Sequence, residues 1–171
     1  MAEVFLALGS NVDAERRLRQ AATLLKQGFP GIRFSACYRN PAVGFEGDDF
    51  VNAAALFQSD ADIPALLERL HAIEEQCGRY RDDPKWAPRA MDLDVLLLDH
   101  RVGEWPGLKL PRPDLMRRAF MLGPAAELAP QFRHPVAQRT LAELWAALAP
   151  TTPPLTRIAL DLNRVDSGDD A

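Results

Sequence analysis

Two aspartates stand at the start of an apolar run, MDLDVLLL at 91–98, which otherwise has the composition of a buried strand. Side chains of a strand alternate between its two faces, so Asp92 and Asp94 point one way while Leu93 points the other. Adjacent carboxylates repel each other, and burying them unpaired is costly. The fold must therefore pack one face of this strand into a core and offer a positive group to the other face.

The segments before this strand follow a regular order. Hydrophobic periodicity predicts strand, helix, strand, strand, helix, strand. The strands are expected at 4–8, 32–38, 50–58 and 91–98, and the helices at 13–27 and 62–77. Asp13 and Asp62 are the expected N-caps, and Gly78 ends the second helix. This is the ferredoxin-like βαββαβ order. It predicts an α+β fold, with an antiparallel sheet, both helices packed on one face, and the other face free to form a site.

The C-terminal third predicts additions to that core. Residues 99–112 look like a hairpin or loop, and a helical stretch at 114–128 is interrupted by Pro124. Thr140 and Glu143 have the spacing of a capping box, which predicts an extra C-terminal helix. We expect a single domain over 1–150, followed by an extension over 151–171 with room for one added strand and a disordered acidic end.

Composition narrows the class of protein. The 171 residues are 47% hydrophobic and carry a net charge of -4, with a pI of about 5.4. Acidity argues against sequence-independent nucleic-acid binding. Cys37 and Cys77 lack metal-site spacing, so we expect reduced, buried thiols. His100 and His134 show no partner signal and are expected at the surface. Neither a membrane span nor a signal peptide is evident, which predicts a cytoplasmic protein, expected to be a monomer.

Cations are concentrated just before the aspartates. Arg79, Arg81, Lys85 and Arg89 all lie within a polar loop. Arginine and lysine bind phosphate, and Mg²⁺ is held by one or two carboxylates plus phosphate oxygens. A metal–phosphate complex would therefore satisfy both groups, and it favours phosphoryl-type transfer. Three alternatives stay open: a simple ion-pair cluster, a palm-type nucleotidyltransferase, and a non-catalytic regulatory or RNA-binding module.

Five segments together resemble one enzyme family. They are ALGSN at 7–11, YRNPAVG at 38–44, FVNAA at 50–54, GRYRDDPKWAPRAMDLD at 78–94 and RRAFMLGPAAELAP at 117–130. Their order and content resemble 6-hydroxymethyl-7,8-dihydropterin pyrophosphokinase, an enzyme of folate biosynthesis. The resemblance implies a ferredoxin-like core. It also implies transfer of the β,γ-pyrophosphoryl group of ATP to the pterin hydroxymethyl oxygen, giving AMP, with two Mg²⁺ ions.

The resemblance also implies roles for individual residues. Asp92 and Asp94 would hold both metal ions. The nucleotide and its phosphates would be bound by His71, Glu74, Arg79, Arg89, Arg112 and Arg118. The pterin would be bound by Asn40, Pro41, Val43, Phe50, Asn52, Trp86 and Phe120. Among these, Arg79, Trp86, Arg89, Asp92 and Asp94 would be the catalytic residues, with Trp86 on a closing loop.

The chain departs from the family pattern in LPRPDL at 110–115. The family usually has a histidine where this chain has Arg112, followed by Pro113. Arginine is always charged and donates from a planar fork, so we expect Arg112 to replace that histidine as a phosphate contact. Acidic Asp82 and Asp83 also lie where relatives are often basic. A diverged paralogue that binds pterin or nucleotide with weak or no catalysis therefore remains an alternative.

Overall fold

A computed structural model describes residues 1–40, 49–78 and 91–164. Its centre is an antiparallel sheet with strand order β5-β1-β4-β3-β8. These strands are β1 (Ala2–Ser10), β3 (Cys37–Asn40), β4 (Phe50–Ser59), β5 (Asp92–Leu98) and β8 (Thr156–Ile158), and β2 (Arg33–Phe34) also pairs with β4. The order of elements from β1 to β5 confirms the predicted ferredoxin-like α+β class.

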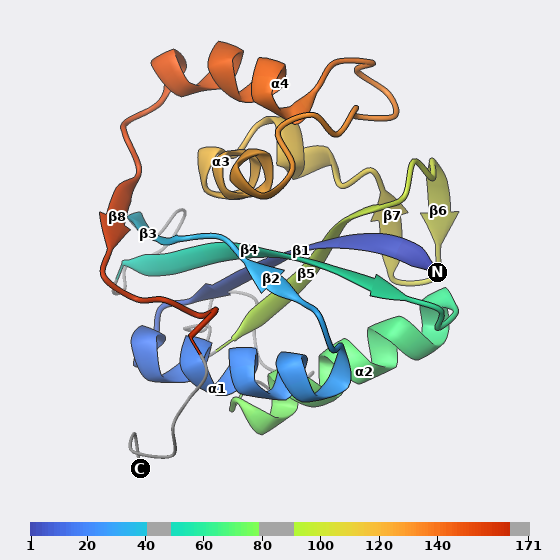
Figure 1. The fold of residues 1–171 in the computed structure, drawn as a ribbon, viewed down its shortest axis with the longest axis vertical. Helices are drawn as coiled ribbons and strands as arrows, with labels where there is room; N and C mark the ends of the chain where they lie inside the picture. Colours follow the sequence, from blue (N-terminus) through green and yellow to red (C-terminus); the bar gives the residue numbers. More distant parts are fainter. Residues whose placement is uncertain (41–48, 79–90, 165–171) are drawn as a thin grey trace.

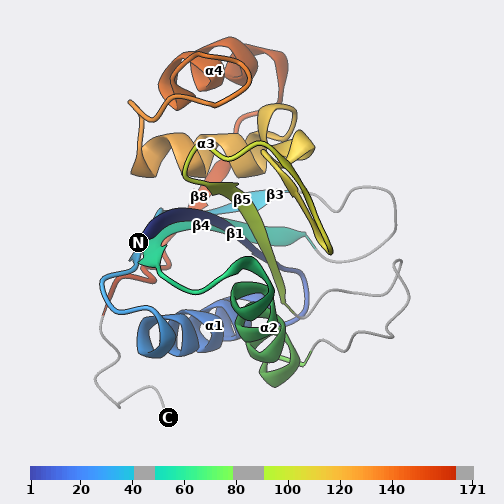
Figure 2. The ribbon, with the colours of Figure 1, turned by 90° about the vertical axis from the view of Figure 1, so that its right-hand side faces the viewer.

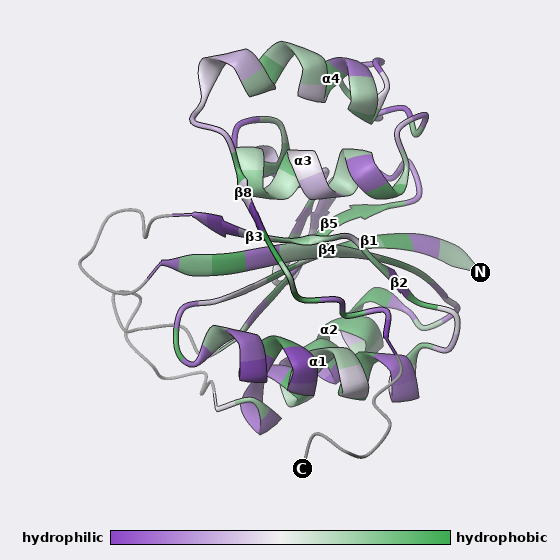
Figure 3. Cartoon of the chain, turned by 60° about the vertical axis from the view of Figure 1, so that its left-hand side comes forward, coloured by the Kyte–Doolittle hydropathy of each residue, from purple (hydrophilic) through white to green (hydrophobic). Residues whose placement is uncertain are grey.

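Helices α1 (Ala14–Gly28) and α2 (Ile63–Gln76) cover one face of the sheet (Figure 1). Each helix turns an apolar stripe inward: Leu18, Ala21, Ala22 and Leu25 of α1 and Leu66, Leu70 and Ile73 of α2 are buried, and Leu67 is partly buried. Figure 3 shows apolar colour along much of β1 and β4 and a mixture of both colours around these helices. The two helices therefore bury one stripe each and keep a polar side outward.

Of the two predicted N-caps, Asp62 is confirmed and Asp13 is wrong. Asp62 caps α2 as expected, because its side chain accepts the Ala65 N–H at 2.9 Å. Asp13 precedes α1 but makes no side-chain cap. Its carboxylate accepts a hydrogen bond from Arg16 Nε at 2.6 Å instead, and its left-handed backbone (φ 49°) is not the extended conformation of an N-cap.

The sequence predicted that the opposite face of the sheet would be free, and this prediction is wrong. Helix α3 (Ala119–Leu128) lies on it, and α4 (Leu141–Leu148) stacks on α3 (Figure 2). A second core forms there from Phe5, Leu96 and Leu122, among others. The capping box of Thr140 and Glu143 is present at the start of α4. The polar residues further along the same strands do not belong to this second core. They therefore remain available to form a site.

A short hairpin returns the chain to β5. It consists of β6 (Gly103–Trp105) and β7 (Leu108–Leu110), and the 3-10 helix Pro113–Met116 then leads to α3. Between them, the Arg112 N–H donates to the Leu96 carbonyl at 3.0 Å. This bond fixes Arg112 beside β5. After α4, the 3-10 helix Ala149–Thr151 leads to β8, which pairs with β3.

The strand expected at 32–38 is interrupted. The Ala36 N–H donates to Glu127 Oε2 of α3 at 2.8 Å and so does not join the β4 ladder. The Ser35 hydroxyl takes part instead, accepting the Ala54 N–H at 2.8 Å. The result is two short strands, β2 and β3, and the residue between them, Ala36, is hydrogen-bonded to Glu127 of α3.

The histidine prediction is half right. His100 is exposed, and its ring stacks on Phe132 with centroids 4.5 Å apart. His134 is wrong as a surface residue, because it is fully buried. Its Nδ1 accepts the backbone N–H groups of Val136 (3.2 Å) and Ala137 (3.1 Å), and this local turn holds the ring inside.

Both cysteines are reduced and buried, as predicted. Burial is the main factor that raises the thiol pKa, to about 12 for Cys37 and about 11 for Cys77, so neither is a ready nucleophile. None of the helices within the described ranges has the length and apolarity to span a membrane.

Candidate active site

A polar row crosses the sheet on the face that also carries α3. Strand register pairs Asp92 with Gly9, Gly9 with Asn52, and Asn52 with Tyr38. Paired residues lie on one face, so the four positions form a line across β5, β1, β4 and β3. Gly9 matters because a Cβ there would lie 2.7 Å from Asn52 Oδ1. Our sequence reasoning missed Gly9, although a glycine ending an apolar strand signals a close approach.

The two aspartates share this face, as the period of two predicts. Asp94 pairs with Ala7, which belongs to the second core, while Leu93 between the aspartates belongs to the first. The positive group beside them is Arg112, whose Nη1 lies 3.6 Å from Asp94 Oδ1. Both side chains are 32% exposed, so a solvent-borne ligand could reach them.

Arg112 also has spare hydrogen-bonding capacity. Its Nε is buried and has no acceptor in the part of the chain that the structure describes. A guanidinium donates up to five hydrogen bonds, and leaving a buried donor unpaired costs free energy. An anionic ligand placed beside Asp94 would supply the missing acceptor.

The carboxylate pair suits a magnesium ion that also binds phosphate. Asp92 and Asp94 offer oxygen ligands two residues apart on a rigid strand. Within the described ranges there is no cluster of three or more His, Cys, Asp or Glu side chains able to hold a metal. Mg²⁺ commonly uses one or two carboxylates and takes its other ligands from water and phosphate, so two carboxylates are sufficient.

Glu74 supports the same strand from behind. It lies on α2, only 7% exposed, and its Oε2 accepts the Leu93 N–H at 2.8 Å. Leu93 stands between the two aspartates, so this bond fixes the backbone that presents them. His71, one turn earlier on α2, is half-buried, and α2 packs on the face opposite the carboxylates. The described structure does not bring His71 to the aspartates.

The predicted pterin residues of the strands do gather. The Asn52 amide donates to Asn40 Oδ1, and Asn40 pairs with Phe50 in the register of β3 and β4. Phe50 Cδ1 lies 3.9 Å from the position of a Cβ on Gly9. The Phe50 ring and the Asn52 amide thus lie beside the backbone of Gly9, and Asn40 accepts a hydrogen bond from that amide.

Two more predicted residues lie at the start of α3. Arg118 is exposed at the N-cap position and makes no capping hydrogen bond with its side chain. Phe120 is partly buried against the second core. The positive end of the α3 dipole and the Arg118 charge together favour an anion near this terminus. The remaining predicted residues, Pro41, Val43, Arg79, Trp86 and Arg89, lie outside the described ranges.

Comparison with known proteins identifies a matching family model and curated relatives. The model "7,8-dihydro-6-hydroxymethylpterin-pyrophosphokinase (HPPK)" matches residues 5–130. The 2-amino-4-hydroxy-6-hydroxymethyldihydropteridine pyrophosphokinase of Pseudomonas aeruginosa is 39% identical over 84% of this chain and 90% of the relative. The enzyme of the same name from Bacillus subtilis is 37% identical over 74% of this chain and 78% of the relative.

Solved structures agree on the fold. An HPPK-DHPS crystallised in complex with substrates matches with a TM-score of 0.66 and 11% identity, over 88% of this chain. Wild-type HPPK-DHPS of Plasmodium falciparum matches with a TM-score of 0.64 and 12% identity, over 85% of this chain. This chain spans 43% and 44% of those two chains, less than half of each. At such identities the likeness concerns the fold alone.

Proposed function

Because the chain belongs to the 7,8-dihydro-6-hydroxymethylpterin-pyrophosphokinase family, we propose that it diphosphorylates 6-hydroxymethyl-7,8-dihydropterin at the expense of ATP, in folate biosynthesis. The hydroxymethyl oxygen bonds to the β-phosphorus, the bond from that phosphorus to the α,β-bridging oxygen breaks, and AMP leaves. The hydroxyl proton is released. The observation that supports this most is the polar row, in which the Asp92 carboxylate and the Asn52 amide stand on either side of Gly9.

The pterin would lie over Gly9. Glycine contributes no side chain there, which lets Asn52 Oδ1 come close to the backbone and present its amide to a flat ring. Asn52 and Asn40 carry amide groups that match the donors and acceptors of a pterin edge. Phe50 and Phe120 offer aromatic faces for stacking. This arrangement would direct the hydroxymethyl arm toward Asp92.

The phosphates would lie beside the aspartates. Asp92 and Asp94 would hold two Mg²⁺ ions, whose charge would neutralise the phosphate oxygens as the β-phosphorus is attacked. Arg112 would move its guanidinium from Asp94 to a phosphate, and Arg118 would approach from the start of α3. The family motif assigns the triphosphate contacts to Arg79 and Arg89 and the closing loop to Trp86.

Glu74 has a positioning role in this scheme. Its carboxylate holds the Leu93 N–H, so it acts through the strand that carries Asp92 and Asp94. The family resemblance implies a nucleotide contact for Glu74 and His71, but the burial of Glu74 favours support of β5 over direct contact with ATP. The proposed enzyme is a cytoplasmic monomer with small-molecule substrates, its catalytic domain covering 1–150.

One observation favours a second candidate function. Arg112 occupies the neighbourhood of Asp94, where a metal ion would bind. If the guanidinium stays there, the chain would bind pterin or nucleotide without turnover, as expected of a diverged paralogue.

An AMP assay separates these functions. Purified protein is incubated with ATP and Mg²⁺, with and without 6-hydroxymethyl-7,8-dihydropterin. The proposed enzyme releases AMP only when the pterin is present. Binding of both ligands without AMP release would identify the non-catalytic paralogue.

A further inference from the structure

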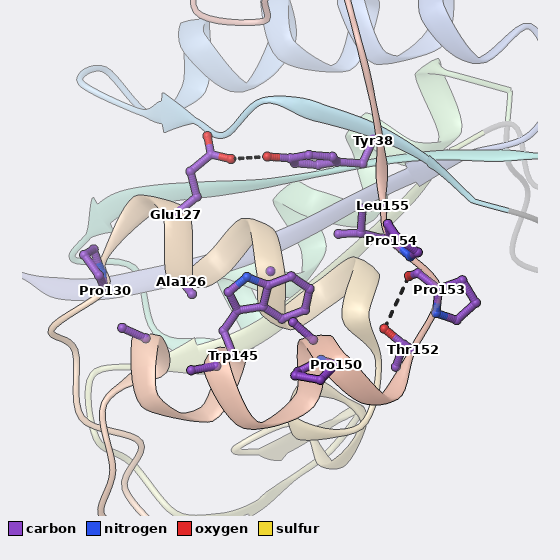
Figure 4. A pocket seen from close by; sticks show the side chains of 14 residues that line it. Tyr38, Ala126, Glu127, Pro130, Trp145, Pro150, Thr152, Pro153, Pro154 and Leu155 are labelled. Carbon is purple, nitrogen blue, oxygen red and sulfur yellow. Dashed lines mark hydrogen bonds between the residues drawn. The ribbon is translucent and has the colours of Figure 1, made fainter.

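A groove lies between α3, α4 and the segment that leads to β8, and Tyr38 at one end of the polar row is among the residues that line it (Figure 4). Its volume is about 800 Å³. Small residues of α3, Gly123 and Ala126, form part of its lining. Volumes of roughly 300–1,000 Å³ are typical of sites for small organic molecules, so the groove is large enough for one.

One wall of this groove is aromatic and apolar. Trp145 of α4 and Leu155 of the returning segment both lie close to Gly123. A Cβ at Gly123 would meet Trp145 Cζ2 and Leu155 Cδ1 at 3.1 Å each. Glycine at this position therefore lets the indole lie against α3. Proline rings at 130, 150, 153 and 154 complete the apolar lining.

The other wall carries an anion. Glu127 Oε1 accepts the Tyr38 hydroxyl at 2.6 Å, and its Oε2 accepts the Ala36 N–H at 2.8 Å. Burial, followed by the hydrogen bond and charge of Glu127, raises the pKa of Tyr38 to about 12, so the phenol remains a donor. An ionised carboxylate has about four acceptor positions, and these two bonds use only half of them.

Glu127 also has no cation of its own. Arg157 lies opposite Tyr38 in the register of β3 and β8, yet no cationic side chain within the described ranges forms an ion pair with Glu127. The carboxylate is exposed at the rim of the groove. Its unused acceptor positions suit a donor that carries positive charge.

We propose that this groove is a second ligand site, for a planar aromatic molecule that bears a cationic donor such as an amidine or a protonated amine. The ring packs against Trp145 and the prolines, and the cationic group donates to Glu127. The site shares Tyr38 with the polar row, but its lining includes none of Asp92, Gly9 and Asn52, and it does not depend on the pyrophosphokinase activity. Its chemistry disfavours phosphate-bearing molecules, because their charge has the same sign as that of Glu127.

Benzamidine tests the proposal, with neutral benzamide as its isosteric control. Binding of each compound to the full chain is measured by calorimetry or ligand-observed NMR. We expect one benzamidine to bind, with benzamide about tenfold weaker or worse, as loss of a charge-assisted hydrogen bond predicts. Glu127→Gln should weaken benzamidine by a similar factor, whereas Glu104→Gln, an exposed charge on β6, should leave it unchanged.

A second variant keeps the test independent of charge. Ala146 of α4 lines the groove and is exposed, so Ala146→Phe fills the space without altering the core. It should abolish benzamidine binding while the melting temperature stays within a few degrees. The proposal is overturned if benzamide binds as well as benzamidine, if Glu127→Gln or Ala146→Phe has no effect, or if benzamidine does not bind at all.

Discussion

Arg112 Nη1 lies 3.6 Å from Asp94 Oδ1, which joins the residue where the chain departs from the family pattern to one of the two carboxylates predicted to bind metal. At 32% exposure an ion pair of this kind contributes little to stability. Its importance is functional under the proposed mechanism, in which Arg112 and a metal ion would compete for the Asp94 carboxylate. If Arg112 shifts to a phosphate when nucleotide binds, the chain would act as an enzyme. If Arg112 stays beside Asp94, the chain would bind its ligands without turnover.

Arg112→Ala should weaken ATP binding or turnover about tenfold or more, since charge-assisted hydrogen bonds contribute about 1.5–3 kcal/mol. Arg112→His should recover part of this loss at pH 6 and less at pH 8, because an unperturbed histidine titrates near 6.5. Arg117→Ala, an exposed neighbour paired with Asp114, is the control. Unchanged ATP affinity and turnover in Arg112→Ala would place this residue outside the site.

Asp94→Asn should reduce turnover by several orders of magnitude, because it removes the proposed metal ligand while preserving side-chain volume. The melting temperature should change little, since only a partly exposed ion pair is lost. Asp60→Asn, on the exposed loop after β4, serves as the control for loss of one charge. Steady-state rates over a range of Mg²⁺ concentrations test this prediction, and near-normal turnover in Asp94→Asn would refute the metal assignment.

Gly9→Ala should weaken pterin binding far more than ATP binding. The added Cβ would lie 2.7 Å from Asn52 Oδ1, so Asn52 or the ring above it must move. Gly28→Ala is the matched control, because its Cβ would meet only the guanidinium end of Arg69, at 3.2 Å, away from the proposed site. Fluorescence titrations with each ligand measure the two affinities. Equal losses for pterin and nucleotide would mean that Gly9 serves the strand and not the ring.

Glu74→Ala should destabilise the protein by about 1–3 kcal/mol, since it leaves the buried Leu93 N–H unpaired. Glu74→Gln keeps an acceptor for that N–H and should recover most of the stability. If Glu74 positions the aspartates, Glu74→Ala also raises the Mg²⁺ concentration needed for half-maximal rate, and Glu74→Gln restores it. A direct contact with ATP would instead raise the KM for ATP in both variants.

His134 should make stability fall in acid. Burial lowers the pKa of His134, so below about pH 6.5 the unfolded chain takes up a proton that the native ring resists. The contribution is constant above that pH and is lost progressively below it. His134→Asn offers an amide oxygen to the Val136 and Ala137 N–H groups and should flatten this part of the profile. Denaturant unfolding at pH 5 and 7.5, with exposed His100→Asn as the control, measures the difference.

The elements of the core could be predicted because their sequence patterns are local. The stripe of Leu18, Ala21 and Leu25 and the alternation of Asp92 with Leu93 each follow from one period. Each period shows which face of a helix or strand a residue lies on. The ferredoxin-like order then predicts which helices pack on which face of the sheet. The same reasoning could not predict that α3 covers the second face, because an almost wholly apolar helix shows no preferred side.

Contacts between residues far apart in the sequence could not be predicted, because no local pattern encodes them. The distance between Arg112 and Asp94 depends on where the β6–β7 hairpin returns the chain, and no local pattern encodes that. The burial of His134 depends on a turn whose backbone donors face Nδ1. The role of Gly9 appears only when register places Asn52 beside it. Each of these relationships joins residues through tertiary structure, not through a period.

The fate of the β-phosphate is the most direct test of the proposed activity. ATP labelled with ³²P at the β-position is incubated with the protein, Mg²⁺ and 6-hydroxymethyl-7,8-dihydropterin, and the products are separated by chromatography. Pyrophosphoryl transfer predicts that the label moves to the pterin product and that the AMP formed is unlabelled. Label recovered as free pyrophosphate or as ADP, or left entirely in ATP, would contradict it.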